Sequence, residues 1–155
     1  MHITLFTIGK LKDSFFGEAQ LHFEKMLRPF CHLTIEELHD DPIRKREPQE
    51  HIIQREGERI LKWLSPDDPV IVLDEKGKQF SSAHFSQWIG NYKDRGDHLQ
   101  CIIGGPYGVS EAVKKRATAI IALSELTLPH QLARIVFLEQ LYRAFTILHG
   151  KQYHY

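Results

Sequence analysis

The hydrophobic positions of the first forty residues change their period twice. Residues 3–8 largely alternate between apolar and polar side chains and stop at Gly9, which predicts a strand. Apolar residues then recur every three or four positions up to Leu27, which predicts a helix that ends before Pro29. Residues 31–38 return to alternation, as expected of a strand with one face in solvent.

The middle of the chain repeats this order of elements. A charged, proline-broken stretch at residues 39–48 predicts a loop before a second helix. One side of that helix is expected to carry Ile53, Gly57, Ile60, Leu61 and Leu64. The apolar run at residues 70–74 predicts a strand buried on both faces, and residues 75–78 predict a turn. Ser81 or Ser82 is then expected to cap a third helix.

The last third of the chain has two more short apolar runs. Residues 99–103 predict a strand that ends in a glycine-rich turn, and Ser110 caps a basic helix after it. Residues 120–123 predict the last strand. Pro129 then marks the start of the longest helix, which is expected to reach about His149.

Strands that alternate with helices predict one layered α/β domain with a mainly parallel sheet over residues 1–155. The 20 Lys and Arg balance the 20 Asp and Glu, which excludes a protein that coats nucleic acid by net charge alone. Cys31 and Cys101 lie in apolar runs and are expected to be buried and reduced. The chain shows no signal-peptide pattern and no membrane-spanning run, so we expect a cytoplasmic protein. No His or Cys spacing typical of a metal site occurs, and we expect no metal.

Three loops follow the carboxyl ends of predicted strands, at residues 73–77, 104–108 and 123–128. Parallel sheets bind ligands at this edge. Glycines in the second loop allow a ligand to approach the backbone, although a plain tight turn explains them equally well. The leucines of the third loop must either pack beneath the last helix or line an apolar pocket, such as one for an adenine ring.

The carboxyl-terminal end is the most basic part of this neutral chain. From His130 onward it has three Lys or Arg, one carboxylate and three histidines, and it ends in Tyr153-His154-Tyr155. Aromatic residues interleaved with cations are typical of sites for unpaired RNA bases and phosphates. A terminal segment without a function is the alternative. Glu139 and Arg143 are four residues apart, which predicts an ion pair within the helix.

Four motifs occur in order along the second half of the chain. They are Ile-Gly-Gly-Pro-Tyr-Gly at 103–108, Leu-Ser-Glu-Leu-Thr-Leu-Pro-His-Gln-Leu-Ala-Arg at 123–134, Glu-Gln-Leu-Tyr-Arg-Ala at 139–144, and Tyr153-His154. Together they resemble the ribosomal RNA large subunit methyltransferase H family. The amino-terminal Gly9-Lys10-Leu11-Lys12 and the central Glu56-Gly57 fit as well, so the resemblance spans the whole chain.

The resemblance implies a SPOUT-type α/β/α fold with a carboxyl-terminal trefoil knot that binds S-adenosylmethionine. It also implies a homodimer that methylates N3 of a pseudouridine in helix 69 of 23S rRNA, on the assembled ribosome. The residue pattern alone gives no sign of a knot and predicts a flavodoxin-like sheet, because knotted chains are rare.

Carried over by position, the resemblance assigns cofactor contacts to Leu73, Gly104, Leu123, Ser124, Glu125, Leu126, Thr127 and Leu128. These residues fall in the three loops that the topology singles out. His154 becomes the first candidate to accept the N3 proton, with Tyr153 positioning the base and Arg143 balancing charge. The terminal segment is expected to reach the partner's cofactor site. Further RNA contacts are assigned to His130, Arg134 and Lys151.

Two other function classes are compatible with the residue pattern. A flavodoxin-like enzyme acting on a small molecule or nucleotide explains the neutral charge and the glycine loop but not the aromatic and cationic tail. A non-catalytic ribosome-binding module explains the tail alone. For the methyltransferase, zero net charge predicts activity on intact ribosomes or large subunits and little on free rRNA.

Overall fold

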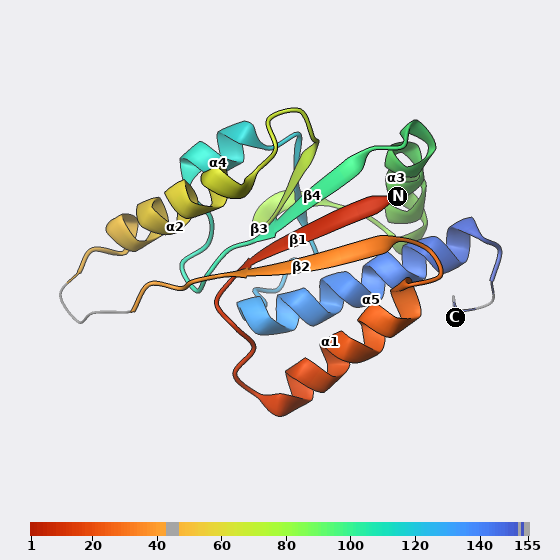
Figure 1. The fold of residues 1–155 in the computed structure, drawn as a ribbon, viewed down its shortest axis with the longest axis horizontal. Helices are drawn as coiled ribbons and strands as arrows, with labels where there is room; N and C mark the ends of the chain where they lie inside the picture. The colour runs from red at the N-terminus through yellow and green to blue at the C-terminus, as the bar shows by residue number, and fades with distance from the viewer. Residues whose placement is uncertain (43–46, 152, 154–155) are drawn as a thin grey trace.

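The computed structural model describes residues 1–42, 47–151 and 153, which form a parallel five-stranded sheet between two layers of helices (Figure 1). In chain order the elements are β1 (His2–Ile8), α1 (Ser14–Leu27), β2 (His32–Leu38), α2 (Gln49–Trp63), β3 (Val70–Gln79), α3 (Ser82–Arg95), β4 (His98–Ile103), α4 (Glu111–Arg116), β5 (Ala119–Ala122) and α5 (His130–Leu148). The strands lie in the order β2-β1-β4-β3-β5, and every pairing is parallel. The predicted α/β class and parallel sheet are confirmed.

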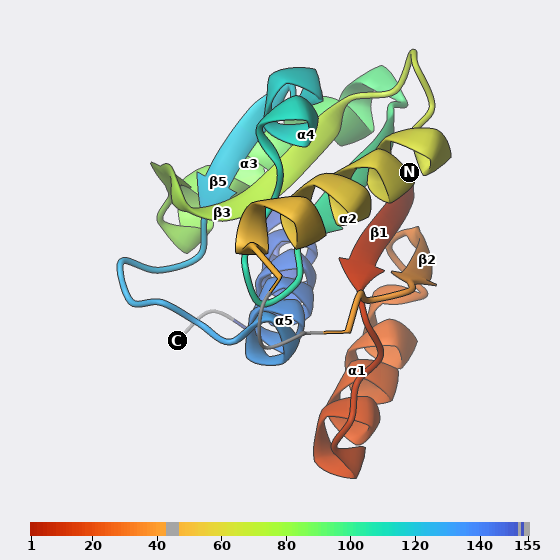
Figure 2. The same cartoon turned by 90° about the vertical axis from the view of Figure 1, so that its left-hand side faces the viewer.

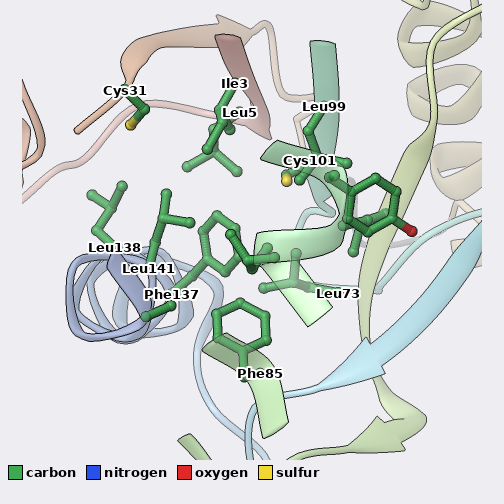
Figure 3. Close-up of a cluster of buried hydrophobic side chains, with 14 of the residues drawn as sticks. Ile3, Leu5, Cys31, Leu73, Phe85, Leu99, Cys101, Phe137, Leu138 and Leu141 are labelled. Carbon is green, nitrogen blue, oxygen red and sulfur yellow. The ribbon is translucent and has the colours of Figure 1, made fainter. Parts of the chain in front are cut away.

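Helices α1, α3 and α5 cover one face of the sheet, and α2 and α4 cover the other (Figure 2). The larger core lies under α5, where Phe137 and Leu141 meet the strand residues Leu5 and Cys101 (Figure 3). The smaller core joins the opposite face of the sheet to α2 and α4 through Phe6, Ile60, Val72, Ile102 and Val113. The sheet is therefore buried on both sides, which explains why its central strands are nearly continuous apolar runs.

Local sequence signals determine where several elements begin. The Ser81 side chain accepts a hydrogen bond from the backbone N–H of His84 at 3.3 Å, and Ser110 accepts one from Val113 at 3.4 Å. Pro129 occupies the N-cap position of α5. These starts confirm the predicted caps, because each depends on residues within one helical turn.

The two cysteines are also as expected. Cys31 and Cys101 are free and buried. Burial raises the pKa of Cys31 to about 12, which keeps the thiol protonated and unreactive at neutral pH.

The turn predicted at residues 75–78 is wrong, because β3 continues to Gln79. Its register with β5 shifts between Leu73 and Lys78, and both of these residues pair with Ile121. Residues 74–77 of β3 therefore form an irregular segment opposite Ile121, between the two pairings. Gly77 permits this close approach, since a Cβ there would lie 2.4 Å from the Ile121 carbonyl carbon.

The buried face of α2 also differs from the prediction. Its buried residues are Ile52, Glu56, Gly57 and Ile60, whereas Ile53, Leu61 and Leu64 are only half-buried. The helix lies close to the start of α4: a Cβ on Gly57 would come within 2.1 Å of the Ser110 hydroxyl. This tight packing turns a charged residue, Glu56, toward the interior.

Candidate active site

A cavity of about 750 Å³ opens where residues 73–76 of β3 and the loops after β4 and β5 converge. Its lining includes Leu73, Gly104, Leu123, Ser124, Leu126, Thr127 and Leu128, which are seven of the eight residues assigned to a cofactor. Glu125 is exposed and is not among the lining residues. The volume falls within the range of roughly 300–1,000 Å³ typical of sites for whole small molecules.

The glycine loop after β4 forms one wall of this first cavity. A Cβ on Gly104 would lie 2.5 Å from the carbonyl oxygen of Gly108, so only glycine fits there. Gly105 and Gly108 pair as an isolated bridge, and Gly108 has a φ of +87°. The loop is thus a closed turn that lines the cavity with its three glycines and with Pro106 and Tyr107.

The loop after β5 forms the opposite wall. The Ser124 hydroxyl accepts a hydrogen bond from the Leu126 N–H at 2.9 Å, and Thr127 donates one to Glu75 at 3.0 Å. These bonds fix the loop at both ends. Leu126 itself is 76% exposed, so an apolar side chain stands at the cavity without covering protein. The sequence left two alternatives for the leucines of this loop, packing beneath the last helix or lining an apolar pocket. The exposure of Leu126 at the cavity fits the apolar pocket.

Sequence reasoning missed an ion pair at the edge of the first cavity. Lys114 lies 2.7 Å from Asp74, and both residues line the cavity. Burial alone would raise the pKa of Asp74, but hydrogen bonds from Lys114 and from the Lys76 N–H lower it below its usual range. The sequence positions of the two residues could have indicated this ion pair, because Asp74 directly follows a buried strand and Lys114 lies in the basic helix.

His130 stands where the first cavity meets a second one. The second cavity, of about 240 Å³, shares Pro106, Tyr107 and His130 with the first. Burial lowers the pKa of His130, and the charges of Arg134 and Lys12 lower it further. The imidazole is therefore neutral at pH 7 and has a lone pair that can accept a proton or a hydrogen bond.

The second cavity also contains Glu56, which the sequence placed in a motif but gave no role. Its side chain is 3% exposed. Burial raises its pKa and the nearby carboxylate of Asp41 adds to this effect, against the opposing influence of the Asp41 N–H and Arg59.

Arg134 is buried rather than presented to a ligand. Only 1% of the residue is exposed, and its guanidinium donates to Glu37 at 2.6 Å, to the Thr7 hydroxyl at 2.8 Å and to the Gly9 carbonyl at 2.8 Å. It ties α5 to β1 and β2 beneath the site. A surface contact to an RNA phosphate is therefore not part of our proposal for Arg134.

The other candidates lie at the far end of α5. Arg143 pairs with Glu139 at 3.0 Å, as predicted, and its guanidinium lies 5.0 Å from the Tyr153 ring. The Lys151 ammonium lies 4.7 Å from the Phe30 ring. Thirteen residues separate His130 from Arg143, which corresponds to about 20 Å along the helix. His154 lies outside the described residues.

Comparison with known proteins identifies the fold family. The profile described as "Predicted SPOUT methyltransferase" matches residues 1–154. The chain belongs to the SPOUT methyltransferase family. A protein named "Ribosomal RNA large subunit methyltransferase H" from Streptococcus mutans is 43% identical, with 99% of each chain covered. Proteins of the same name from Clostridium acetobutylicum and Leuconostoc mesenteroides are 42% and 44% identical over 99% of each chain.

One solved structure supports the fold alone. It is titled "The structure of a probable methylase family protein from Haemophilus influenzae Rd KW20", with a TM-score of 0.52, 15% identity, and coverage of 97% of this chain and 67% of that one. The family resemblance drawn from the four motifs is thus confirmed. Membership of the SPOUT methyltransferase family also decides against the flavodoxin-like and non-catalytic alternatives.

Two features of the described residues bear on other functions. No group of three or more His, Cys, Asp or Glu in residues 1–42 and 47–151 is arranged to hold a metal ion. Within the same part of the chain, no helix combines the length and hydropathy required to cross a membrane.

Proposed function

We propose that this SPOUT methyltransferase transfers a methyl group from S-adenosylmethionine to large-subunit rRNA. Its target is N3 of a pseudouridine in helix 69 of 23S rRNA. The observation that carries the proposal is the first cavity, where segments of β3 and the loops after β4 and β5 bring together the residues that the family motifs assign to the cofactor. Full-length relatives named for this activity support the substrate class.

The residues of the first cavity fit S-adenosylmethionine. Gly104 and Gly108 leave backbone groups open to an adenine edge, and Leu126 and Leu128 supply apolar contact for the ring. The Asp74–Lys114 pair offers both a hydrogen-bond acceptor and a donor to the hydroxyl groups of a ribose.

When bound, S-adenosylmethionine supplies a methyl group on a sulfonium, which is already a strong leaving group. The protein's own task is to hold N3 in line with that methyl and to accept the N3 proton. We assign the proton to His154, the positioning of the base to Tyr153, and charge balance to Arg143. Neutral His130 lies at the cavity itself and holds the base or a neighbouring RNA group.

The position of the tail supports a homodimer with a shared site. Arg143, Lys151 and Tyr153 cluster at the end of α5 opposite to His130, about 20 Å or more along the helix from the same chain's cavity. In a two-fold dimer, each tail serves the cavity of the other protomer. The half-buried apolar residues of α5, such as Ile135 and Val136, are available for that contact.

Three finer features belong to the same proposal. The carboxyl-terminal part is a trefoil knot, which membership of the SPOUT methyltransferase family supports. The substrate is the assembled ribosome or large subunit, because a chain with zero net charge binds free RNA weakly. The enzyme works in the cytoplasm, where ribosomes assemble.

The test is to incubate large ribosomal subunits with the protein and labelled S-adenosylmethionine, and to map methylated nucleotides by mass. We expect one methyl on the helix 69 pseudouridine and little transfer to free 23S rRNA. Efficient methylation of a short free hairpin would contradict the ribosome requirement, and transfer to another nucleotide would contradict the target.

A further inference from the structure

The second cavity lies beside the cofactor cavity at the carboxyl ends of β1 and β2. Ile8 and Ile52 contribute apolar walls, and Pro106, Tyr107 and His130 form the boundary with the first cavity. Its volume of about 240 Å³ is below the range of roughly 300–1,000 Å³ typical of whole-ligand sites. The cavity is therefore suited to one flat ring rather than to a complete nucleoside.

Glu56 gives this cavity a specific polar group. Oε1 accepts a hydrogen bond from the Asp41 N–H at 3.3 Å, whereas Oε2 is buried and has no hydrogen-bond partner among the described residues. The carboxyl lies against Gly105, where a Cβ would come within 2.8 Å of Oε2. A buried oxygen without a donor destabilises the free protein, so its retention points to a ligand that supplies the donor.

The surroundings of Glu56 select the class of ligand. A carboxylate oxygen accepts hydrogen bonds, the adjacent walls favour a flat apolar ring, and the exposed Lys10 and Lys12 at the same cavity favour a phosphate. A nucleobase with a ring N–H, still attached to its RNA strand, satisfies all three. Methyl transfer requires a different ring nitrogen of the same base to face the first cavity. The base must therefore carry two ring N–H groups, one that donates to Glu56 and one that is methylated.

We propose that the second cavity receives the target base and that Glu56 Oε2 accepts a hydrogen bond from N1–H of pseudouridine while N3 faces the first cavity. This inference rests on the proposed function and adds a specificity residue to it. Pseudouridine has ring N–H groups at both N1 and N3, on the two sides of the C2 carbonyl, whereas uridine has only N3–H because its N1 carries the sugar. Glu56 thereby distinguishes pseudouridine from uridine.

The decisive variant is Glu56→Gln, which keeps the size of the side chain. Its amide oxygen can still accept from the Asp41 N–H, but the NH₂ group then occupies the position of Oε2 and cannot accept from N1–H. Glu58→Gln is the matched control, because Glu58 is exposed on the same helix. Glu56→Asp is the second variant, which keeps a carboxylate but withdraws it by one methylene.

The experiment measures kcat/KM on two kinds of large subunit, one with pseudouridine at the target and one with uridine, and cofactor affinity by calorimetry. We expect wild type and Glu58→Gln to prefer the pseudouridine substrate. Glu56→Gln should lose at least about tenfold on that substrate, as for a hydrogen bond to a charged group, and stay within about threefold on uridine. On the pseudouridine substrate, kcat/KM of Glu56→Asp should lie between the values of wild type and Glu56→Gln. The cofactor affinity of every variant should stay within about twofold of wild type.

Three results would overturn the inference. They are equal losses on both substrates, a parallel loss of cofactor affinity, or no change on either substrate. The first two would mean that Glu56 only supports the glycine loop. Wild-type protein that binds the cofactor but methylates neither substrate would refute the proposed function, and the base site with it. Wild-type protein that methylates both substrates equally would refute the inference alone.

Discussion

The two ends of α5 differ in what they provide. At its start, His130 and Ala133 line a cavity built from several elements of the same chain. At its other end, Arg143, Lys151 and Tyr153 lie around surface aromatic rings, away from both cavities lined by His130. The difference teaches that one protomer supplies the whole first cavity, whereas under the proposed function the groups for proton transfer reach such a cavity only in a second copy.

Removing the tail is expected to have the largest effect. Deletion of Tyr153 to Tyr155, or His154→Ala, should lower methyl transfer by at least about 100-fold, the loss expected for a general base. Cofactor affinity should stay within about twofold, because the first cavity does not include these residues. Transfer and calorimetry measured on the same preparations check both numbers. Turnover within about threefold of wild type would show that the tail has no catalytic part.

A change in the wall of the first cavity should give the opposite pattern, a loss of cofactor affinity. In Gly104→Ala the new Cβ would lie 2.5 Å from the Gly108 carbonyl oxygen, so the glycine loop must shift. We expect cofactor affinity to fall by about tenfold or more in calorimetry, and transfer to fall with it.

Gly17→Ala is the matched control for this change. No atom lies within 4 Å of a Cβ at this helical position, so the variant should keep cofactor affinity and gain roughly 0.5–1 kcal/mol in the free energy of unfolding. Unchanged cofactor affinity in Gly104→Ala would contradict the assignment of the first cavity.

The smallest expected effect concerns stability rather than activity. Because the pKa of Glu56 is raised in the folded state, its contribution to stability is complete below its ordinary pKa of 4.5 and is lost as pH rises through the folded value. Glu56→Gln removes this loss. Its free energy of unfolding should therefore improve relative to wild type from pH 5 to pH 8, as measured by urea unfolding.

Glu58→Gln is expected to show no such trend, because Glu58 is exposed. A Glu56→Gln variant whose relative stability falls as pH rises would mean that the buried carboxylate stabilises the fold. The buried position of the Glu56 carboxylate would then be explained without a ligand.

The sequence was a good guide where structure depends on neighbouring residues. Alternating and apolar runs identified the strands, and Ser81, Ser110 and Pro129 identified helix starts, because capping acts within one turn. The three segments that meet at the first cavity were also identified, since the carboxyl edge of a parallel sheet is a general binding position.

What the sequence missed depends on contacts between distant segments. The polar residues 75–78 resemble a turn, yet pairing with β5 makes them part of β3. The burial of Arg134 was missed because its hydrogen-bond partners come from β1 and β2, more than ninety positions away in the chain. Glu56 was assigned no role, since a single glutamate on an amphipathic helix normally faces solvent.

The most direct test of a site shared between two chains is to mix two variants, at a cofactor concentration at which each is nearly inactive alone. One has an intact cavity but no Tyr153 to Tyr155, and the other has an intact tail but carries Gly104→Ala. After subunit exchange at equal concentrations, half of the dimers are mixed and each has one intact site, so methyl transfer to large subunits should return to about one quarter of wild type. A mixture that stays as inactive as its separate components, despite proven exchange, would contradict the account.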